Sequence, residues 1–232
     1  MSEQKNSHVL SRLLMESGGV EAMIARDSPT HRILTEEERH ASLREALAQK
    51  PAGETWVFGY GSLIWNPTIH HIDSQPVRIH GWHRSFCLSV TAGRGSPEQP
   101  GLVLALDEGG SCSGVAYQLE EANVWRELEL LWRREMVSGA YIPRWLPMLS
   151  LTGEARGYGL AFTMDHGHEQ YAGDLTEEEL LYRIAYAGGA LGSCAEYLFH
   201  TCEGLHQSGI ADRDLDQLAQ SVKAYQAQAI HR

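Results

Sequence analysis

The pattern of hydrophobic and polar residues divides the chain into two parts. Residues 36–50 have the composition of a helix, and a Pro-Ala-Gly sequence directly after them ends it. Thr35 and Glu38 open this helix with the spacing of a capping box. We therefore predict a helical N-terminal extension over residues 1–53 and a second domain over residues 54–232.

Short apolar runs separated by Gly and Pro begin directly after this helix. Runs of this kind are typical of strands that are joined by hairpins. The predicted strands lie in segments 56–65, 77–79, 85–90, 101–106 and 114–119. Their spacing predicts a small, curved antiparallel sheet or barrel.

Helical patterns return after the fifth predicted strand. The remaining predicted elements are a helix over 120–136, a strand over 157–164 and helices over 176–187, 193–206 and 212–228. Thr176 and Glu179 form a second capping box, and Asp212 is placed to cap the last helix. A β-rich core with helices at both ends predicts an α+β fold rather than alternating βαβ units.

Composition narrows the range of partners. The chain has 232 residues, of which 43% are hydrophobic and 21% charged, the profile of a globular protein with a real core. Its 19 Lys and Arg against 30 Asp and Glu give a net charge of −11, which repels phosphate backbones and anionic lipid surfaces. The longest apolar stretch, residues 56–65, is shorter than the about 20 residues that span a bilayer. We therefore expect no nucleic-acid partner and no membrane association.

The N-terminal sequence and the cysteines indicate the compartment. MSEQKNSHVLSRLLMES contains no cationic segment leading into an apolar run, so we expect no signal peptide and a cytoplasmic protein. The cysteines are scattered, with no CxxC pair that would suggest zinc or a redox dithiol, and we expect reduced thiols. They are Cys87, Cys112, Cys194 and Cys202.

Histidine pairs invite a metal hypothesis that the sequence does not favour. Neither His70-His71 nor His166-Gly167-His168 has the helical i, i+4 spacing of paired metal ligands, and neither is accompanied by an obvious third ligand. We expect no metal and no organic cofactor.

Gly59-Tyr60-Gly61-Ser62 lies within a strongly β-prone segment. Two glycines weaken a strand unless the backbone must bend or admit a ligand closely, so the segment is either a ligand-binding loop or a turn without a ligand. A dinucleotide fingerprint would need glycine where Ile64 stands. Ser62 has no GxSxG context, so the sequence does not favour it as a nucleophile.

Glu135 falls in the apolar stripe of its predicted helix. At about 100° per residue, it lies close to Leu128 and Leu131, with Trp125 and Trp132 on one flank. The other charged residues of the helix, including Glu127 and Arg134, are predicted to point elsewhere. A desolvated glutamate has a raised pKa and suits base catalysis, whereas a glutamate in a frayed last turn would be solvated.

Two arginines and one tyrosine are weaker candidates for a site. Residues 94–101 are rich in Gly and Pro and are predicted to form a flap. Arg84 and Arg94 are candidate cations for a substrate that carries carboxylates, or else ordinary surface arginines. Tyr197 is either a core aromatic or a phenol that is directed into the site.

Several of these segments resemble the ChaC-like, glutathione-specific γ-glutamylcyclotransferases. The matching segments, in the order found in that family, are residues 56–65 (WVFGYGSLIW), the 94–101 loop, residues 114–117 (GVAY), Arg134-Glu135 followed by Gly139 and Tyr141, and residues 195–198 (AEYL). The resemblance runs from about residue 55 to beyond residue 200. The first 50 residues match nothing in the core pattern of the family.

The resemblance implies a fold, a reaction and a set of site residues. The fold is the small mixed barrel of the γ-glutamylcyclotransferases, and the reaction cleaves glutathione to 5-oxoproline and Cys-Gly. Glu135 is the implied catalytic acid/base. The implied substrate-binding residues are Val57, Phe58, Gly59, Tyr60, Gly61, Ser62, Leu63, Arg94, Tyr141 and Tyr197. The chain departs from the family in the longer spacing between Glu135 and Tyr141, and in Leu102, which replaces a frequent Arg.

This reaction is consistent with the candidate residues. The α-amine of the substrate attacks its own γ-carbonyl carbon, so no protein nucleophile is needed, but a base must accept a proton. Two alternatives remain: a cyclotransferase for other γ-glutamyl compounds, and a non-catalytic module that binds a metabolite on the same fold. A carboxylate in an apolar stripe argues against the second alternative.

Overall fold

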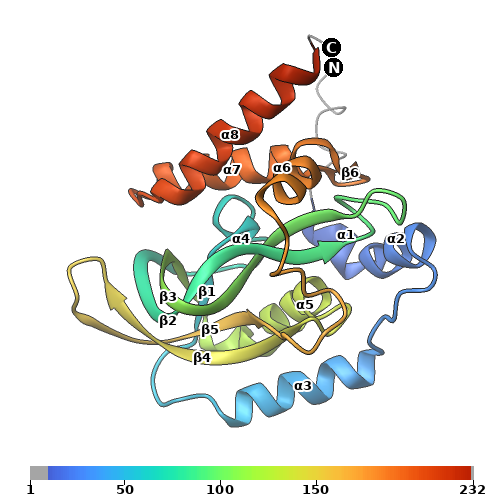
Figure 1. The fold of residues 1–232 in the computed structure, drawn as a ribbon. Helices are drawn as coiled ribbons and strands as arrows, with labels where there is room; N and C mark the ends of the chain where they lie inside the picture. Colours follow the sequence, from blue (N-terminus) through green and yellow to red (C-terminus); the bar gives the residue numbers. More distant parts are fainter. Residues whose placement is uncertain (1–9, 231–232) are drawn as a thin grey trace, which may run out of the picture.

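A computed structural model describes residues 10–230, with side chains described as far as residue 228 (Figure 1). Residues 1–9 of the predicted extension, which carry most of the segment searched for a signal peptide, and residues 231–232 lie outside the described part. The helices are α1 (Arg12–Glu16), α2 (Gly19–Asp27), α3 (Glu36–Ala48), α4 (Ser62–Trp65), α5 (Val124–Glu135), α6 (Glu177–Tyr186), α7 (Cys194–Gln207) and α8 (Arg213–Ile230). The strands are β1 (Trp56–Gly59), β2 (Asp73–Val90), β3 (Gly101–Gln118), β4 (Tyr141–Ser150), β5 (Ala155–Met164) and the two-residue pair β6 (Gly188–Gly189) and β7 (Gly192–Ser193). A 3₁₀ turn, Glu121–Asn123, leads into α5.

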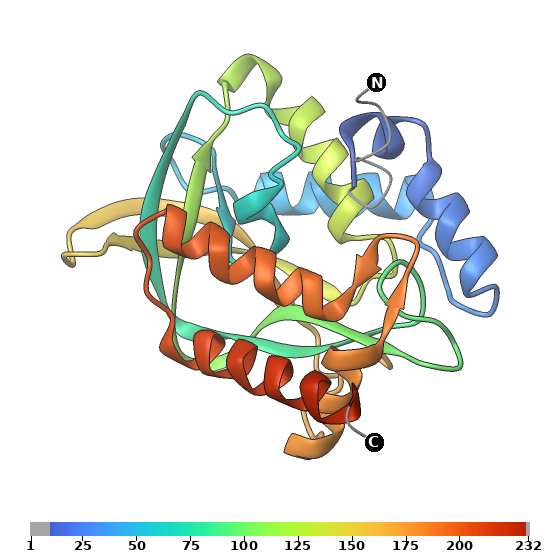
Figure 2. The ribbon, with the colours of Figure 1, turned by 90° about the horizontal axis from the view of Figure 1, so that it is seen from above.

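Five strands close into a barrel in the order β1-β3-β2-β4-β5. Most pairs are antiparallel, and a parallel pair of β1 with β5 closes the barrel, with Val57 opposite Leu160. The predicted α+β fold with a small mixed barrel is confirmed. The helices α6, α7 and α8 lie on one side of the barrel and α3 lies on the other, as Figures 1 and 2 show.

The second to fifth predicted short strands are two long ones. Predicted strands 77–79 and 85–90 both lie in β2, and 101–106 and 114–119 both lie in β3, apart from residue 119. The register shifts between His80 and Trp82, where one residue of β2 faces two residues of β3. Such a bulge bends two paired strands without ending them. The glycines between the predicted short strands within β2 and within β3 therefore mark bends and not hairpin turns.

Two further elements differ from the prediction. The predicted strand 56–65 ends at Gly59, and its second half is the helix α4. The strand β4 was not predicted, because Pro143 and Pro147 interrupt its pattern. Both prolines lie opposite residues of β5, whereas the pairing of β4 with β2 is confined to Leu149 and Ser150. Proline is tolerated where a strand has no second partner.

The predicted helix caps are confirmed, whereas the helix predicted from residue 120 begins at Val124, after a 3₁₀ turn. Thr35 and Thr176 each accept from the N3 backbone N–H, and the glutamate at N3 accepts from the cap residue in return. Asp212 accepts from the backbone N–H of Leu215 at the start of α8. No helix among residues 10–230 has both the length and the apolar character needed to cross a membrane.

The helix α3 packs on the barrel. Leu43 and Ala46 belong to the same apolar core as the barrel residues, and the indole N–H of Trp145 donates to the carbonyl oxygen of Ala46 at 2.7 Å. A smaller apolar cluster joins α1 and α2 to α5. The N-terminal helices therefore cover the part of the molecule that carries Glu135.

Candidate active site

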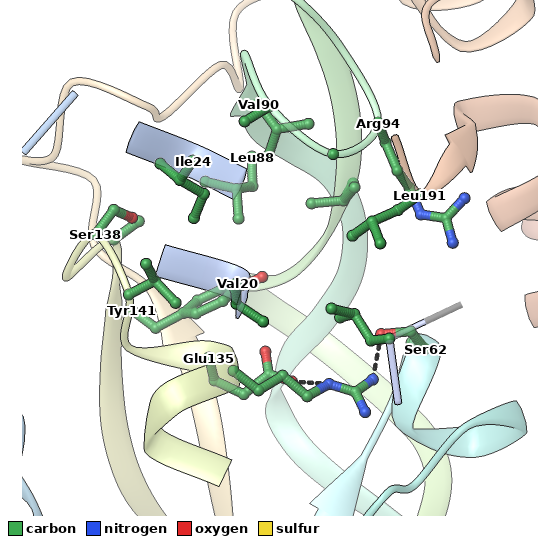
Figure 3. A pocket seen from close by; sticks show the side chains of 18 of the residues that line it. Val20, Ile24, Ser62, Leu88, Val90, Arg94, Glu135, Ser138, Tyr141 and Leu191 are labelled. Carbon is green, nitrogen blue, oxygen red and sulfur yellow. Dashed lines mark hydrogen bonds and ion pairs between the residues drawn. The ribbon is translucent and has the colours of Figure 1, made fainter. Parts of the chain in front are cut away.

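A cavity of about 200 Å³ opens beside the C-terminal end of α5 (Figure 3). Its walls come from segments far apart in the sequence: α2, the loop before α4, strands β2, β3 and β4, the end of α5, and α7. Glu135, Ser62 and Tyr141 lie on one side of the view, and Leu88 and Val90 lie on the other. The cavity therefore has a polar side, at Glu135 and Ser62, and a mostly apolar side at Leu88 and Val90, which also carries Arg94.

Most of the predicted site residues meet in this cavity. Its lining includes Tyr60, Gly61, Ser62, Leu63, Arg94, Glu135, Tyr141 and Tyr197. The other three, Val57, Phe58 and Gly59, form the strand β1, and the lining of the cavity does not include them. They position the loop that follows them rather than face the cavity.

Glu135 is the last residue of α5, and its side chain is only 15% exposed. Burial raises the pKa of this carboxyl above its ordinary value, while the neighbouring guanidinium of Arg134 acts in the opposite direction. The alternative of a solvated glutamate in a frayed last turn does not fit this environment. The carboxylate is poised to accept a proton from a group bound in the cavity.

Arg134 joins Glu135 to the segment Gly59-Tyr60-Gly61-Ser62, called the glycine loop below. Its Nε lies 3.0 Å from Oε1 of Glu135, and its Nη2 donates to the hydroxyl oxygen of Ser62 at 2.8 Å (Figure 3). The guanidinium is also held by the carbonyl oxygen of Asn66 at 2.6 Å and the hydroxyl oxygen of Thr68 at 2.8 Å. One buried cation thus fixes the carboxylate relative to the start of α4.

The prediction that the other charged residues of α5 point elsewhere is wrong for Arg134, which is 8% exposed, lines the cavity and pairs with Glu135. Glu127 does point elsewhere, outside the cavity lining, but it is buried at 2% exposure rather than solvated. Periodicity fails here because the N-terminal segment covers a second face of the helix, where Arg12 pairs with Glu127. The two tryptophans also differ, since Trp132 is buried and Trp125 is 42% exposed. Arg134, a buried arginine beside the candidate base, is the main site residue that was not predicted from the sequence.

Gly61 is the tightest point of the glycine loop. A Cβ atom at this position would lie 2.6 Å from the phenol oxygen of Tyr197 and 3.6 Å from Cβ of Leu104. The backbone φ of Gly61 is −130°, so the requirement for glycine comes from space and not from a left-handed conformation. The Tyr197 phenol is directed into the site, next to this loop.

Three phenols surround the carboxylate. The hydroxyl of Tyr60 donates to the carbonyl oxygen of Phe162 at 2.9 Å, and that of Tyr141 donates to the carbonyl oxygen of Leu104 at 3.1 Å. Burial raises the pKa of Tyr60 and Tyr141 well above the ordinary value and that of Tyr197 to about 12. All three phenols are therefore neutral at pH 7, and they provide polar groups without adding negative charge.

The two candidate arginines have different positions. Arg94 lines the cavity; its guanidinium lies over the rings of Trp65 and Tyr197 and donates to the carbonyl oxygen of Ser193 at 2.9 Å. Burial lowers the pKa of Arg94. Arg84 is not a site cation, because its guanidinium is held by Asp212 and by the carbonyl oxygens of Tyr60 and Ser113, outside the lining of the cavity.

The N-terminal segment also contributes to the cavity. Its lining residues are Leu10, Val20, Met23, Ile24 and His31. No site role was predicted for these residues, although Val20, Met23 and Ile24 have the i, i+3, i+4 spacing of an apolar helix face. That spacing was the signal that could have identified this wall.

The chain matches the model of one protein family, and its sequence is similar to those of a bacterial and a human enzyme. The profile of the family described as ChaC-like protein matches residues 55–225. The glutathione-specific γ-glutamylcyclotransferase of Escherichia coli (strain K12) is 45% identical over 188 residues, covering 81% of this chain and 81% of that protein. Glutathione-specific γ-glutamylcyclotransferase 1 of Homo sapiens is 32% identical, covering 73% of this chain and 77% of that protein.

A solved structure shows the same fold. The crystal structure of a γ-glutamyl cyclotransferase specific to glutathione from yeast superposes with a TM-score of 0.67 at 24% sequence identity. The match covers 75% of this chain and 97% of the yeast chain. This structure supports the fold, and the family match together with the bacterial relative confirms the resemblance found in the sequence.

Proposed function

The chain belongs to the ChaC-like protein family, and we propose that it is a glutathione-specific γ-glutamylcyclotransferase, with Glu135 as its acid/base group. Such an enzyme is a lyase that converts glutathione to 5-oxoproline and Cys-Gly. The observation that carries the proposal for the site is the buried carboxylate of Glu135, which lines the cavity together with Gly61 and Ser62. The printed names of the bacterial and human relatives support the substrate.

The reaction forms a five-membered lactam within the substrate. The α-amine of the γ-glutamyl group attacks the γ-carbonyl carbon, and the bond to the cysteine nitrogen breaks. Because nucleophile and carbonyl belong to one molecule, effective molarities of about 10⁵ M or more replace a protein nucleophile. The enzyme therefore has to hold a folded substrate and move protons.

Glu135 performs both proton transfers in this mechanism. As a carboxylate it accepts the proton that the α-ammonium group loses when the amine attacks. As a carboxylic acid it then gives a proton to the departing cysteine nitrogen. Burial, which raises its pKa, makes the carboxylate a stronger base than a solvated glutamate and brings its pKa nearer to neutral pH, where one group can both accept and return a proton.

The glycine loop binds the γ-glutamyl group. Residues 57–63 lead from β1 into α4, and the absence of a side chain at Gly61 lets the substrate approach the backbone. Backbone N–H groups at the start of α4 are suitable donors to the carbonyl oxygen as negative charge develops on it. Tyr141 and Tyr197 complete this polar side of the cavity.

Arg94 and Arg134 supply positive charge for the carboxylates of the substrate. Both arginines line the cavity, in a protein whose net charge is −11. An anionic substrate needs such local cations to overcome the acidic field of the whole chain. Since Arg134 already pairs with Glu135, Arg94 is the more available of the two.

We also propose that the protein acts in the cytoplasm. All four cysteines are free and buried, which fits a reducing compartment. Glutathione is the partner in this proposal, and the net charge of −11 continues to argue against nucleic acid. The division into an extension of residues 1–53 and a domain of residues 54–232 stays a prediction.

Mass spectrometry of the purified protein tests the proposed function. Incubation with glutathione should release 5-oxoproline and Cys-Gly in equal amounts. γ-Glutamylalanine and γ-glutamyl-ε-lysine, incubated in parallel, separate a glutathione-specific enzyme from a cyclotransferase of broad specificity. Binding of glutathione without any 5-oxoproline would instead identify a metabolite-binding module.

A further inference from the structure

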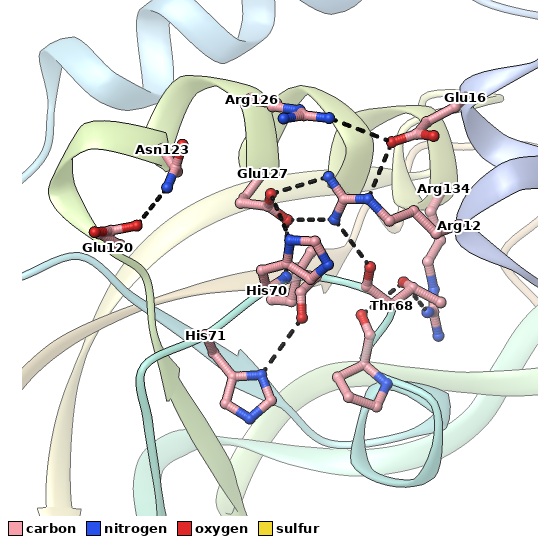
Figure 4. Close-up of polar contacts among 12 residues, drawn as sticks. Arg12, Glu16, Thr68, His70, His71, Glu120, Asn123, Arg126, Glu127 and Arg134 are labelled. Atoms are coloured by element: carbon pink, nitrogen blue, oxygen red, sulfur yellow. Dashed lines mark hydrogen bonds and ion pairs between the residues drawn. The ribbon is translucent and has the colours of Figure 1, made fainter.

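The N-terminal segment is attached to the helix that carries Glu135. Arg12 of α1 forms two hydrogen bonds with the carboxylate of Glu127 on α5, at 2.6 and 2.9 Å, and Glu127 is 2% exposed (Figure 4). Beside this pair, Met15 and Val20 pack on Leu130 of α5. A buried ion pair next to an apolar cluster holds α1 and α2 in one position on α5.

A second set of contacts joins this segment to Arg134. The side chain of Asn66 donates to the carbonyl oxygen of Leu10 at 2.7 Å, while the carbonyl oxygen of Asn66 accepts from Arg134. Thr68 bridges in the same way, because its carbonyl oxygen accepts from Arg12 and its hydroxyl accepts from Arg134 (Figure 4). The N-terminal segment and the active-site cation are therefore built into one polar network.

The helix α2 forms an apolar wall of the cavity. Its wall residues Val20, Met23 and Ile24 come from adjacent turns of one face. A Cβ atom at Gly93, in the loop after β2, would lie 3.4 Å from Cε of Met23 and 3.1 Å from Cδ1 of Leu191. The helix α2, the loop after β2 and the turn between β6 and β7, which are distant in the sequence, therefore pack closely together on this side of the cavity.

The layout of the cavity orients a γ-glutamyl substrate. The charged amino and carboxyl groups of the γ-glutamyl part require the polar side, where Glu135 and the glycine loop lie. The remainder of the substrate must then extend along the mostly apolar side, where Figure 3 places Ile24, Leu88 and Val90. Arg94 lies on the same side and is the cation available to the carboxylate of the glycine residue. Ile24 and Met23 are only partly buried, so their side chains are available to a bound molecule.

We propose that α2 is a specificity wall, in which Met23 and Ile24 contact the leaving group and limit its size. The inference rests on the proposed function, because only that reaction defines a leaving group. The anchored wall admits the Cys-Gly part of glutathione and excludes bulky groups attached to its sulfur. The residues of α2 are therefore determinants of specificity that act at the end of the substrate opposite the bond-forming amine.

Met23→Ala and Ile24→Ala test this proposal, with glutathione and S-hexylglutathione as the two substrates. The alkyl chain changes only the leaving group, so the ratio of the two kcat/KM values reports the wall alone. Each variant should raise this ratio in favour of S-hexylglutathione by about tenfold or more, the effect expected when a pocket gains room for several methylene groups. Leu13→Ala, on α1 of the same segment with 74% exposure and outside the cavity lining, is the matched control.

The outcomes separate this proposal from the proposed function. If the wild-type protein releases no 5-oxoproline from glutathione, the proposed function fails and the wall has no role in it. If the wild-type protein is active but both variants keep the wild-type ratio, the wall proposal is wrong. The same holds if both substrates lose activity in parallel, because that result describes a purely structural helix. Thermal unfolding of each variant confirms that the ratio is measured on folded protein.

Discussion

The guanidinium of Arg134 and the carboxylate of Glu135 pair at 3.0 Å although the two residues are neighbours in the sequence. Adjacent residues on a helix normally point about 100° apart. The pair forms here because Glu135 ends α5 and Arg134 is held by the 62–68 segment. Burial raises the pKa of Glu135 and the cation lowers it, so the two effects together set the pH at which the proposed base is ionised.

Removal of this cation should change the pH dependence of the reaction. In Arg134→Gln, the pKa of Glu135 rises further because only burial remains, and the carboxylate is protonated at a higher pH. The acidic limb of the kcat/KM profile should therefore move to higher pH. Arg133→Gln, which changes the preceding residue of the same helix outside the cavity lining, is the control that should leave the limb unmoved. An unshifted limb in Arg134→Gln would contradict the assignment of Glu135 as the base.

Glu135→Gln should lose most turnover while it still binds glutathione. Glutamine preserves the shape of the side chain but accepts no proton, and general base catalysis contributes about 10²–10⁴-fold. Rates of 5-oxoproline release and the glutathione affinity of the variant check both parts. A kcat close to that of the wild type would show that another group is the base.

The same variant should be at least as stable as the wild type at pH 7. A carboxyl group whose pKa is raised on folding binds its proton more tightly in the folded state, so its ionisation favours unfolding as the pH rises. The amide in the Glu135→Gln protein does not ionise, and the difference in melting temperature between variant and wild type should shrink toward pH 4. Thermal unfolding of the variant and the wild type at pH 7 and at pH 4 measures this difference. A catalytic group that costs stability is expected at an active site.

The predictable parts of this molecule are those that depend on local sequence. The capping boxes at Thr35 and Thr176 need only residues three positions apart, and both are present. The glycine loop and Glu135 were found because each breaks a local rule: glycines within a strand pattern, and a charge within an apolar stripe. Such local conflicts mark the candidate site.

The parts that were missed depend on contacts between distant segments. The pattern of α5 could not show that Arg134 is buried, because the groups that hold it come from residues 62–68. The N-terminal wall was missed for the same reason, since an apolar face on α2 predicts burial but not the cavity against which it packs. The long strands β2 and β3 were also not predicted, because the β-bulges between them bend the strands at positions where the sequence pattern indicates that a strand ends.

Alkylation of the protein thiols should leave the activity unchanged. All four cysteines are buried, and burial raises the pKa of Cys87 to about 12 and those of Cys194 and Cys202 to about 11. Thiols in this state react slowly, and none has a role in the proposed steps. The protein is treated with iodoacetamide, freed of reagent and assayed with fresh glutathione. Loss of activity in proportion to alkylation of one cysteine would give that thiol a role.

Gly61→Val should abolish binding of glutathione. The added Cβ would lie 2.6 Å from the phenol oxygen of Tyr197, and the branched side chain would fill the space beside the backbone where the γ-glutamyl group is proposed to bind. Isothermal titration with glutathione measures the loss, and circular dichroism confirms the fold. Ala52→Val is the matched control, because it adds a branched side chain at an exposed position before β1 and outside the cavity lining. That control should bind glutathione like the wild type, and wild-type affinity in Gly61→Val would contradict the proposed binding role of the loop.

Ser62→Ala distinguishes direct cyclisation from acyl transfer to the enzyme. The hydroxyl of Ser62 accepts a hydrogen bond from Arg134 at 2.8 Å, so its loss frees one donor of the cation that positions Glu135. A hydrogen bond of this kind contributes about 0.5–3 kcal/mol, and we expect a reduction in kcat/KM within the roughly 150-fold that this range allows. If Ser62 were instead a nucleophile, the variant would be as inactive as Glu135→Gln, and a covalent γ-glutamyl adduct would accumulate on the wild-type protein. Complete inactivity of a well-folded Ser62→Ala would therefore overturn the mechanism, whereas a partial loss would agree with a role of Ser62 in holding Arg134.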